Sequence, residues 1–314
     1  LDLPRIQLDK IFALGKTAVF DRSQMSLPEL SVGFDPEKET FLIPMRYRDS
    51  GWFDYHPPDV QHLITLWYLT HNEKDRERIE QLRAKSSKDW AQVVSQHNKE
   101  DRTNDRAWFA YLQGDNPDFP IQALEAAIEQ VNRRVALIAT DDADLTQVNI
   151  HHWQNHNPIT TETLVQLMLG APQMLYYGGS LLTNLFYFQV QANRPGLPDE
   201  VSALVENIDG DGVTVHLVNL SASHTHNLII QGGALGEHRI TTITYTITDE
   251  EASAPIDAGA NKRPLHTITT TRTITVDDVH VQLEMPALTQ IRLEIGLERY
   301  VNPPRYNSSI VKEH

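Results

Sequence analysis

The spacing of apolar residues changes once along this chain, and this change constrains the fold more than any other feature. Up to about residue 175, apolar side chains recur every three or four positions, which predicts helices. Beyond about residue 181 they alternate with polar side chains over short stretches, which predicts strands. We therefore expect an α+β protein with a helical domain at residues 1–175 and a β-rich domain with a C-terminal tail at residues 176–314.

The clearest predicted helix begins after Asp118, a residue type that caps helices, and ends near Thr140. We expect its apolar side to face the core: Ile121, Leu124, Ala127, Ile128, Val131, Val135 and Ile138. We expect its charged residues on the exposed side: Glu125, Glu129, Arg133 and Arg134. Three shorter segments have helical spacing: residues 60–69, 73–96 and 104–112. Residues 1–56 are less regular and are predicted to end in a long structured connection.

Roughly eight short strands are predicted after residue 190, which is typical of an antiparallel β-sandwich. The clearest are residues 213–218, 241–248, 267–276, 279–283 and 291–295. Residues 209–212 (Asp-Gly-Asp-Gly) approach a calcium-loop pattern, but its twelfth position is Leu220 rather than glutamate, so we predict a hairpin turn. His216, His224 and His226 form either a metal site or a group of exposed histidines.

Composition limits the partners of this protein. Its 314 residues are enough for two domains, and no run approaches the ~18 apolar residues that a membrane helix needs. The net charge of -15 argues against nucleic acid and anionic membranes. The absence of cysteine excludes disulfides, thiolate zinc sites and cysteine nucleophiles, and leaves open a soluble cytoplasmic or exported protein. Because the chain begins at Leu1, we expect a processed or truncated chain, whose site a further chain or missing N-terminal region could complete.

Four blocks of sequence carry a resemblance: residues 110–120, 157–167, 193–198 and 231–238. Together they resemble an uncharacterised family of bacterial proteins with a helical region and a C-terminal β domain. The resemblance covers about residues 100–305 and implies no activity and no catalytic residue. The layout is also similar to that of polysaccharide lyases and glycosidases built on an (α/α) toroid. Those families have more helices than are predicted here, so this likeness implies only part of a toroid.

A loop dense in histidine precedes the change of period, and it contains His151, His152 and His156. One imidazole could act as a general base, because histidine exchanges a proton near neutral pH. His152 and His156 also have the i, i+4 spacing of two metal ligands on one helix face. No glutamate lies between them and Asn157-Pro158 disfavours a helix, so we expect no cofactor and keep a metal at these three histidines as an alternative. The other alternative is a polar loop with ordinary hydrogen bonds.

Residues 47–56 interleave aromatic and charged side chains, as a sugar-binding cleft does. In this interpretation Trp52 stacks on a sugar ring, while Arg48, Asp49 and His56 bind its polar groups. Asp49 and Asp54 could form the carboxylate pair of a glycoside hydrolase. A tyrosine or histidine base beside an arginine would instead suit β-elimination from a uronate. The alternative is an aromatic-rich connection that packs on the helices.

These observations favour a carbohydrate-active protein, either a polysaccharide lyase or a glycoside hydrolase, with a cleft where residues 47–56 meet the histidine loop. We expect His152 or His156 to act as the base and Tyr55 or Asp54 as the acid. Six further residues are predicted to contact a carbohydrate or other small ligand: Arg48, Asp49, Trp52, His56, Asn157 and Tyr176. The alternative is a non-catalytic binding or assembly module of a larger protein.

Overall fold

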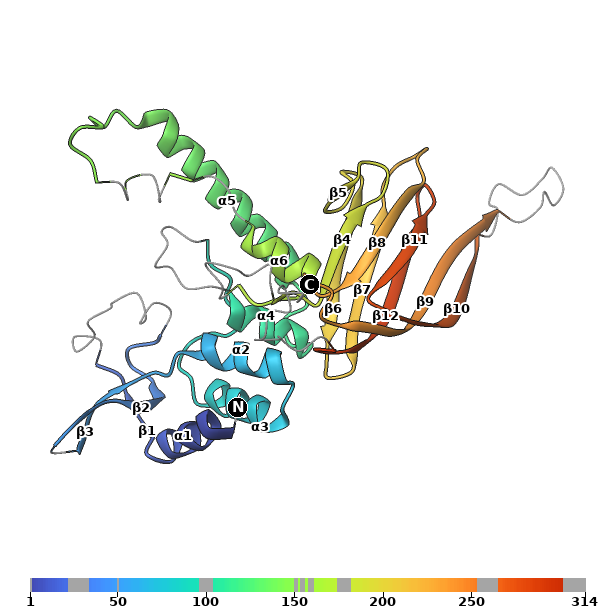
Figure 1. Cartoon of the computed structure of the whole chain (residues 1–314). Coiled ribbons are helices and arrows are strands. Elements are labelled where there is room, and N and C mark those ends of the chain that lie inside the picture. Colours follow the sequence, from blue (N-terminus) through green and yellow to red (C-terminus); the bar gives the residue numbers. More distant parts are fainter. Residues whose placement is uncertain are drawn as a thin grey trace, which may run out of the picture. The chain divides into compact units, whose positions relative to one another are not determined.

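The computed structural model (Figure 1) describes residues 2–21, 34–49, 51–95, 104–149, 152, 156–157, 161–173, 182–252 and 265–301. The chain divides into two compact units. A helical unit comprises Leu1–Thr163 and Pro172–Met174, and a two-sheet unit comprises Leu164–Ala171 and Leu175–His314. Helices and antiparallel sheets are both present, which confirms the predicted α+β class. The sequence-based boundary at residue 175 keeps the helix Glu162–Leu169 in the first domain, whereas this division splits it.

Five helices belong entirely to the helical unit. They are α1 (Asp2–Ala13), α2 (Val60–Thr70), α3 (Glu73–Ala84), α4 (Asp105–Leu112) and α5 (Phe119–Thr140). The next helix, α6 (Glu162–Leu169), spans the point in the sequence where one unit ends and the other begins. Among the described residues, no helix is both long enough and apolar enough to cross a membrane.

A small antiparallel sheet also lies in the helical unit, where the sequence predicts only a structured connection. Its order is β1 (Lys16–Val19), β2 (Glu39–Arg48) and β3 (Gly51–His56). Phe41, Leu42 and Ile43 of β2 are buried, so the apolar residues of this segment do enter the core, as a strand. Pro44 obscures the strand pattern in the sequence, and the register shift beside it shows how a bulge accommodates the proline.

The α2 and α3 helices begin at side-chain caps and pack through aromatic residues. Asp59 Oδ1 accepts from the Gln61 N–H at 3.0 Å, and Asn72 Oδ1 accepts from the Lys74 N–H at 3.0 Å. The core of the unit is aromatic: the rings of Trp67 and Phe109 lie edge to face, with centroids 5.1 Å apart. Packing of α2 against α4 through this pair therefore stabilises the centre of the helical unit.

A buried ion network joins α1 to α3. Asp75 is only 2% exposed, and its carboxylate accepts from Arg5 Nη2 at 2.8 Å, Arg78 Nη1 at 2.8 Å and Thr70 Oγ1 at 3.0 Å. Burial acts to raise the pKa of Asp75, but the hydrogen bonds from Arg5, Thr70 and Arg78 outweigh it and hold the pKa below its ordinary value. Arg78 also donates to Asp9 Oδ1 at 2.5 Å, so two arginines and two aspartates tie the first helix to the third.

The orientation of α5 differs from the prediction. Its buried residues are Phe119, Ala123, Gln130 and Arg134, whereas the predicted core residues Ile121 and Ile128 are 63% and 61% exposed. Arg134 Nη1 donates to the Asn157 carbonyl at 2.9 Å, and the Gln130 carboxamide oxygen accepts from both Nη atoms of Arg134 when its amide is oriented to satisfy both groups. The prediction that Arg134 lies on the exposed face is therefore wrong, because its bonds hold the guanidinium inside the unit.

Two antiparallel sheets make up the second unit. The five-stranded sheet has the order β10-β9-β12-β7-β6 and the four-stranded sheet the order β11-β8-β4-β5. The bounds are β4 (Leu185–Gln189), β5 (Arg194–Pro195), β6 (Val201–Ile208), β7 (Gly212–Asn219), β8 (His226–Gly232), β9 (Arg239–Ala252), β10 (Leu265–Asp278), β11 (His280–Met285) and β12 (Gln290–Glu298). Each sheet buries one apolar face, with Val215 and Leu293 in the larger and Leu228 and Ile230 in the smaller.

The turn between β6 and β7 confirms the predicted hairpin. Asp209 Oδ1 accepts from the backbone N–H groups of Asp211 and Gly212, at 2.8 and 2.9 Å. The Asp209 N–H in turn donates to the Gly212 carbonyl at 3.1 Å. The aspartate thus closes its own turn, as aspartate side chains do at such positions.

Candidate metal centre

Asp141 ends α5 and has one of its two carboxylate oxygens fixed by the backbone. The residue is extended (φ -73°, ψ 111°), and its N–H donates to the Ile138 carbonyl at 3.4 Å. Its Oδ1 accepts from the Ala143 N–H at 3.2 Å. Because Oδ1 is engaged in this way, the other oxygen, Oδ2, is directed towards the histidine loop.

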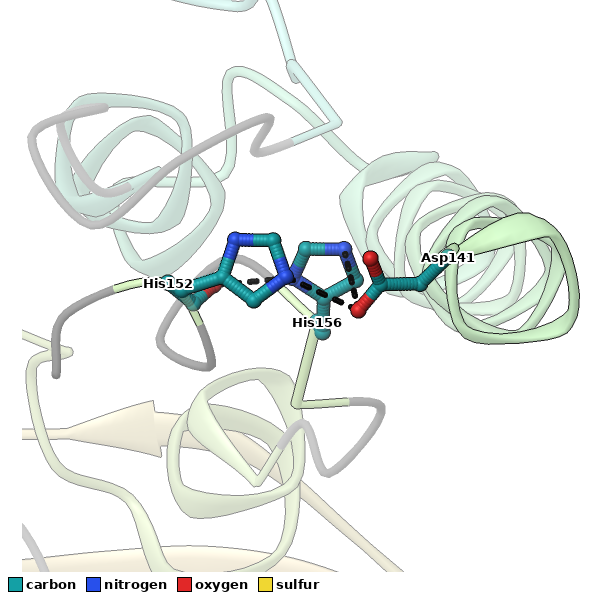
Figure 2. A group of neighbouring side chains, drawn as sticks. All are labelled: Asp141, His152 and His156. Carbon is teal, nitrogen blue, oxygen red and sulfur yellow. Dashed lines mark hydrogen bonds and ion pairs between the residues drawn. The ribbon is translucent and has the colours of Figure 1, made fainter. Parts of the chain in front are cut away.

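Two histidines of that loop converge on Asp141 Oδ2, as Figure 2 shows. His152 Nε2 lies 2.8 Å from this oxygen and His156 Nε2 lies 3.9 Å from it. The two imidazole rings are neighbours, with centroids 4.5 Å apart. One ligand atom from each of the three residues lies within 4.8 Å of the others, and all three side chains are less than a quarter exposed. The sequence places His152 and His156 together correctly, although the cluster is not a regular helix in the described residues.

A backbone contact fixes the tautomer of His156. Its Nδ1 lies 2.8 Å from the carbonyl oxygen of His152. A carbonyl oxygen can only accept, so Nδ1 carries the proton and the neutral ring keeps its lone pair on Nε2. Histidine ligands in metal sites characteristically donate their other ring N–H to a carbonyl or carboxylate in this way. The contact therefore prepares His156 Nε2, the atom that faces Asp141, to bind a cation.

The Asp141 carboxylate is held in its charged form. The hydrogen bond from His152 is the largest influence that lowers the pKa of Asp141, and the bond from the Ala143 N–H adds to it, while burial opposes both. An ionised carboxylate beside two imidazoles becomes a donor set of one oxygen and two nitrogens once the proton that His152 Nε2 donates to Asp141 is released or moves to Nδ1. Zinc and iron(II) accept such a set, whereas calcium and magnesium prefer oxygen ligands alone.

The spacing of the donor atoms also suits a small cation. Ligand atoms bound tetrahedrally at 2.0–2.1 Å from zinc lie about 3.3 Å from one another. The distances from Asp141 Oδ2 to the two histidine nitrogens, 2.8 and 3.9 Å, fall on either side of that value. Shifts of roughly half an ångström would therefore bring each histidine nitrogen to ligand spacing from Asp141 Oδ2.

Comparison with protein families matches residues 1–165 to a domain of unknown function, DUF8034. This match covers more than half of the chain and includes Asp141, His152 and His156. The chain belongs to the DUF8034 family. A comparison with curated proteins gives no match. The match confirms that the chain belongs to an uncharacterised family, but over residues 1–165 rather than the predicted residues 100–305.

The DUF8034 region also contains the second predicted group, on strand β3. Asp54 lies 3.3 Å from Arg46 Nε of the neighbouring strand, and the Tyr55 ring lies beneath Lys16 Nζ at 4.1 Å. Trp52 is 41% exposed. Because side chains alternate along a strand, Asp54 and His56 share one face of β3 and Tyr55 lies on the other, while a register shift between the pairs Arg46–Asp54 and Tyr47–Trp52 interrupts this alternation before Trp52. The two residues predicted as alternative acids, Asp54 and Tyr55, therefore point in opposite directions.

The remaining predicted residues have varied positions. His56 packs edge to face against Phe20, with ring centroids 5.9 Å apart, and its Nδ1 is buried without a hydrogen-bond partner. Asp49 is exposed at the end of β2. The backbone carbonyl of Asn157 accepts a hydrogen bond from Arg134 Nη1. His151 and Tyr176 lie outside the described residues, as does the side chain of Arg48.

Sequence analysis missed Asp141, although it is the residue that joins the two histidines. It lies eleven positions before His152, directly after the long helix. The expectation of no cofactor considered only residues inside the loop. An acidic residue at a helix end shortly before a His-x3-His pair is the pattern that could have revealed it.

In the two-sheet unit, His224 Nδ1 and His226 Nε2 both contact Glu200 Oε2, at 3.5 and 3.0 Å. His216 pairs with Glu206 instead, and its Nε2 lies 2.9 Å from Glu206 Oε1. Among the described residues, the Asp141 group is the only set of three or more histidine and acidic side chains close enough to share one ion. The described geometry therefore favours the DUF8034 region as the place for metal chemistry.

Proposed function

We propose that the DUF8034 region binds one divalent transition-metal ion through Asp141 Oδ2, His152 Nε2 and His156 Nε2, and that the protein is a metal-dependent hydrolase. The observation that carries this proposal is the bond from His156 Nδ1 to the His152 carbonyl, because it leaves Nε2 as a lone-pair donor facing an ionised carboxylate. Three protein ligands leave one position of a tetrahedral zinc ion for water, as in catalytic rather than structural zinc sites.

The chemistry follows from that donor set. A zinc ion supplies a nucleophile near neutral pH, because it lowers the pKa of bound water to about 7. The protein's own contribution is to hold the ligands: Ala143 orients the carboxylate and the His152 carbonyl orients the His156 ring. The same two-histidine, one-carboxylate set also suits iron(II) and oxygen chemistry, so the identity of the metal decides between hydrolysis and oxidation.

Metal analysis of protein purified without added metal tests this proposal. We expect close to one zinc ion for each chain, and loss of that ion in His156→Ala and Asp141→Asn. His62→Ala and Asp144→Asn are matched controls, because they remove a histidine that pairs with Asp59 and an aspartate that caps Thr146. A wild-type protein that takes up no zinc or iron after chelation and titration would refute the metal site. One iron in place of zinc would redirect the proposal to oxygen chemistry.

A second candidate function is carbohydrate recognition at β3, favoured by the exposed Trp52 on the same strand as Asp54, which pairs with Arg46. In this proposal the helices form part of a toroid and the two sheets pack as a sandwich, as in bacterial polysaccharide lyases and glycosidases. Titration of acidic and neutral oligosaccharides tests it. We expect binding that Trp52→Ala abolishes and that Tyr300→Ala, which removes an exposed aromatic of the two-sheet unit, preserves. Equal binding by both variants would rule out β3 as the platform.

A further inference from the structure

The apolar side of α5 is exposed, which is unusual for a helix of this length. Five large apolar residues along this side are between 40% and 63% exposed, and a sixth, Val131, is partly exposed; Leu137, on another side, is 39% exposed. We call this set the α5 stripe: Ile121, Leu124, Ile128, Val131, Val135 and Ile138. A contiguous apolar patch on a protein surface normally marks an interaction site.

The spacing of the stripe is that of a coiled coil. Its members follow one another at intervals of three, four, three, four and three residues, which are the a and d positions of a heptad pattern. The buried residues Ala123, Gln130 and Arg134 lie on an adjacent side of the helix, with Arg134 next to the stripe. A helix that served only its own unit would turn its apolar side inward. The pattern therefore points to a second helix with matching spacing.

We propose that a second copy of this chain covers the α5 stripe, through antiparallel pairing of the two α5 helices about a two-fold axis between residues 129 and 130. Antiparallel coiled coils pair a positions with d positions. This axis places Ile121 opposite Ile138 and Leu124 opposite Val135. At the centre it places Ile128 opposite Val131. Every layer is then apolar, and the stripe is self-complementary, as a two-fold interface requires.

The charges of α5 are compatible with the antiparallel direction; only Glu125 and Arg134 flank the stripe, and Arg134 also bonds to Asn157 in its own unit. Glu125 and Glu129 lie in the first half of α5, and Arg133 and Arg134 lie in the second half. Antiparallel pairing sets the acidic half of one α5 helix beside the basic half of the other. Parallel pairing would set the two acidic halves, and the two basic halves, beside each other. At the positions that flank the layers, Glu125 faces Asn132 and Arg134 faces Ala127, so no like charges meet.

The molar mass of the full 314-residue chain in solution tests this interface. We expect twice the 35.7 kDa of one chain by light scattering, and a return to a single chain in the double variant Ile128→Asp/Val131→Asp. Leu220→Asp/Leu235→Asp is the matched control, since both leucines are more than 60% exposed but lie in the two-sheet unit. Unchanged tryptophan fluorescence shows that the α5 variant remains folded. A wild-type mass of one chain at all concentrations would overturn the proposal.

The direction of pairing can be tested because the chain has no cysteine. We expect Ile121→Cys/Ile138→Cys to form disulfide-linked dimers and Ile121→Cys alone to remain uncrosslinked. The two positions lie about 25 Å apart on one helix, so they cannot join within a chain. Efficient crosslinking of Ile121→Cys alone would instead show parallel pairing and contradict the proposed arrangement. None of these outcomes depends on whether the metal centre is occupied.

Discussion

The two units of this protein stabilise their interiors in different ways. The helical unit buries charged and amide side chains that bond to one another or to the backbone, and Asp75, Arg78 and Arg134 are the clearest examples. The two-sheet unit buries the apolar faces of its strands, while its charged side chains pair at the surface, as Arg292 does with Glu206. Helices satisfy their backbone internally and can pack in several ways, so side-chain bonds select one arrangement. Strands are already fixed by their backbone ladders.

The two-sheet unit also buries a hydrogen-bonded amide, that of Asn219. Asn219 is 1% exposed and its Nδ2 donates to the carbonyls of His224, Met285 and Pro286, at 2.9, 3.0 and 2.9 Å. Its Oδ1 accepts from the Ser221 N–H at 3.0 Å. It therefore satisfies backbone carbonyls where strands end, and through Met285 it also ties the end of β7 to the end of β11.

Loss of the ion network should destabilise the helical unit more than any other change considered. Asp75→Ala leaves Arg5 and Arg78 without their buried partner, and removal of one member of such a pair costs about 3 kcal/mol. All five tryptophans lie within residues 52–153, so their fluorescence during denaturation follows the helical unit alone. Asp277→Ala, which removes an exposed partner of Arg239, should change the free energy of unfolding by less than about 0.5 kcal/mol. Equal effects of the two variants would contradict the role assigned to the network.

Metal should stabilise only one of the two units. Zinc at about one hundred times its dissociation constant should raise the free energy of unfolding of the helical unit by about 2.7 kcal/mol, because the ion binds the folded site. The tryptophan transition should move to higher denaturant concentration, and the circular dichroism of the strands should not follow it. His156→Ala should abolish the shift and His62→Ala should keep it. A shift of the strand transition would place the ion elsewhere.

Removing the buried amide of Asn219 should destabilise the two-sheet unit and leave the helical unit unchanged. Asn219→Ala leaves three carbonyls and one N–H without their partner, at a cost of about 1–3 kcal/mol. Circular dichroism of the strands should report this loss while the tryptophan transition stays in place. Asn207→Ala, which removes an exposed side chain beside Asp209, is the control with little expected change. Movement of both transitions together would show that the units do not unfold independently.

Lowering the pH should destabilise the two units at different pH values. Burial lowers the pKa of His238 to about 4, and nearby Arg299 adds to this. The neutral ring is thus favoured by folding, so its stabilisation is complete above the unfolded pKa of about 6.5 and declines as pH falls towards 4, by about 2 kcal/mol at pH 5. Asp75 has a lowered pKa, so its contribution persists until pH falls below about 4. Strand signals should therefore weaken before tryptophan fluorescence on acidification. His238→Gln should remove the early loss, and an unchanged profile would exclude His238 as its cause.

Much of the local structure was predictable from the sequence. The helix that begins near Asp118, the alternating strands after residue 190 and the aspartate turn at residues 209–212 all follow from side-chain spacing and turn chemistry. The pair His152 and His156 was also singled out, because four residues separate them. These features depend on neighbours within a few positions, which a sequence displays directly.

Local sequence patterns were thus enough to predict the type and order of most elements and two of the three residues in the candidate site. Only the tertiary structure decided which side of α5 lies inside, because the bonds from Arg134 to Asn157 and Gln130 outweigh an apolar pattern that predicts the opposite. Only the tertiary structure brought Asp141 to the two histidines. The physical reason is the same in both cases. Spacing fixes which side chains share a face, but what that face meets depends on segments distant in the sequence, and their bonds to it are not encoded in any local period.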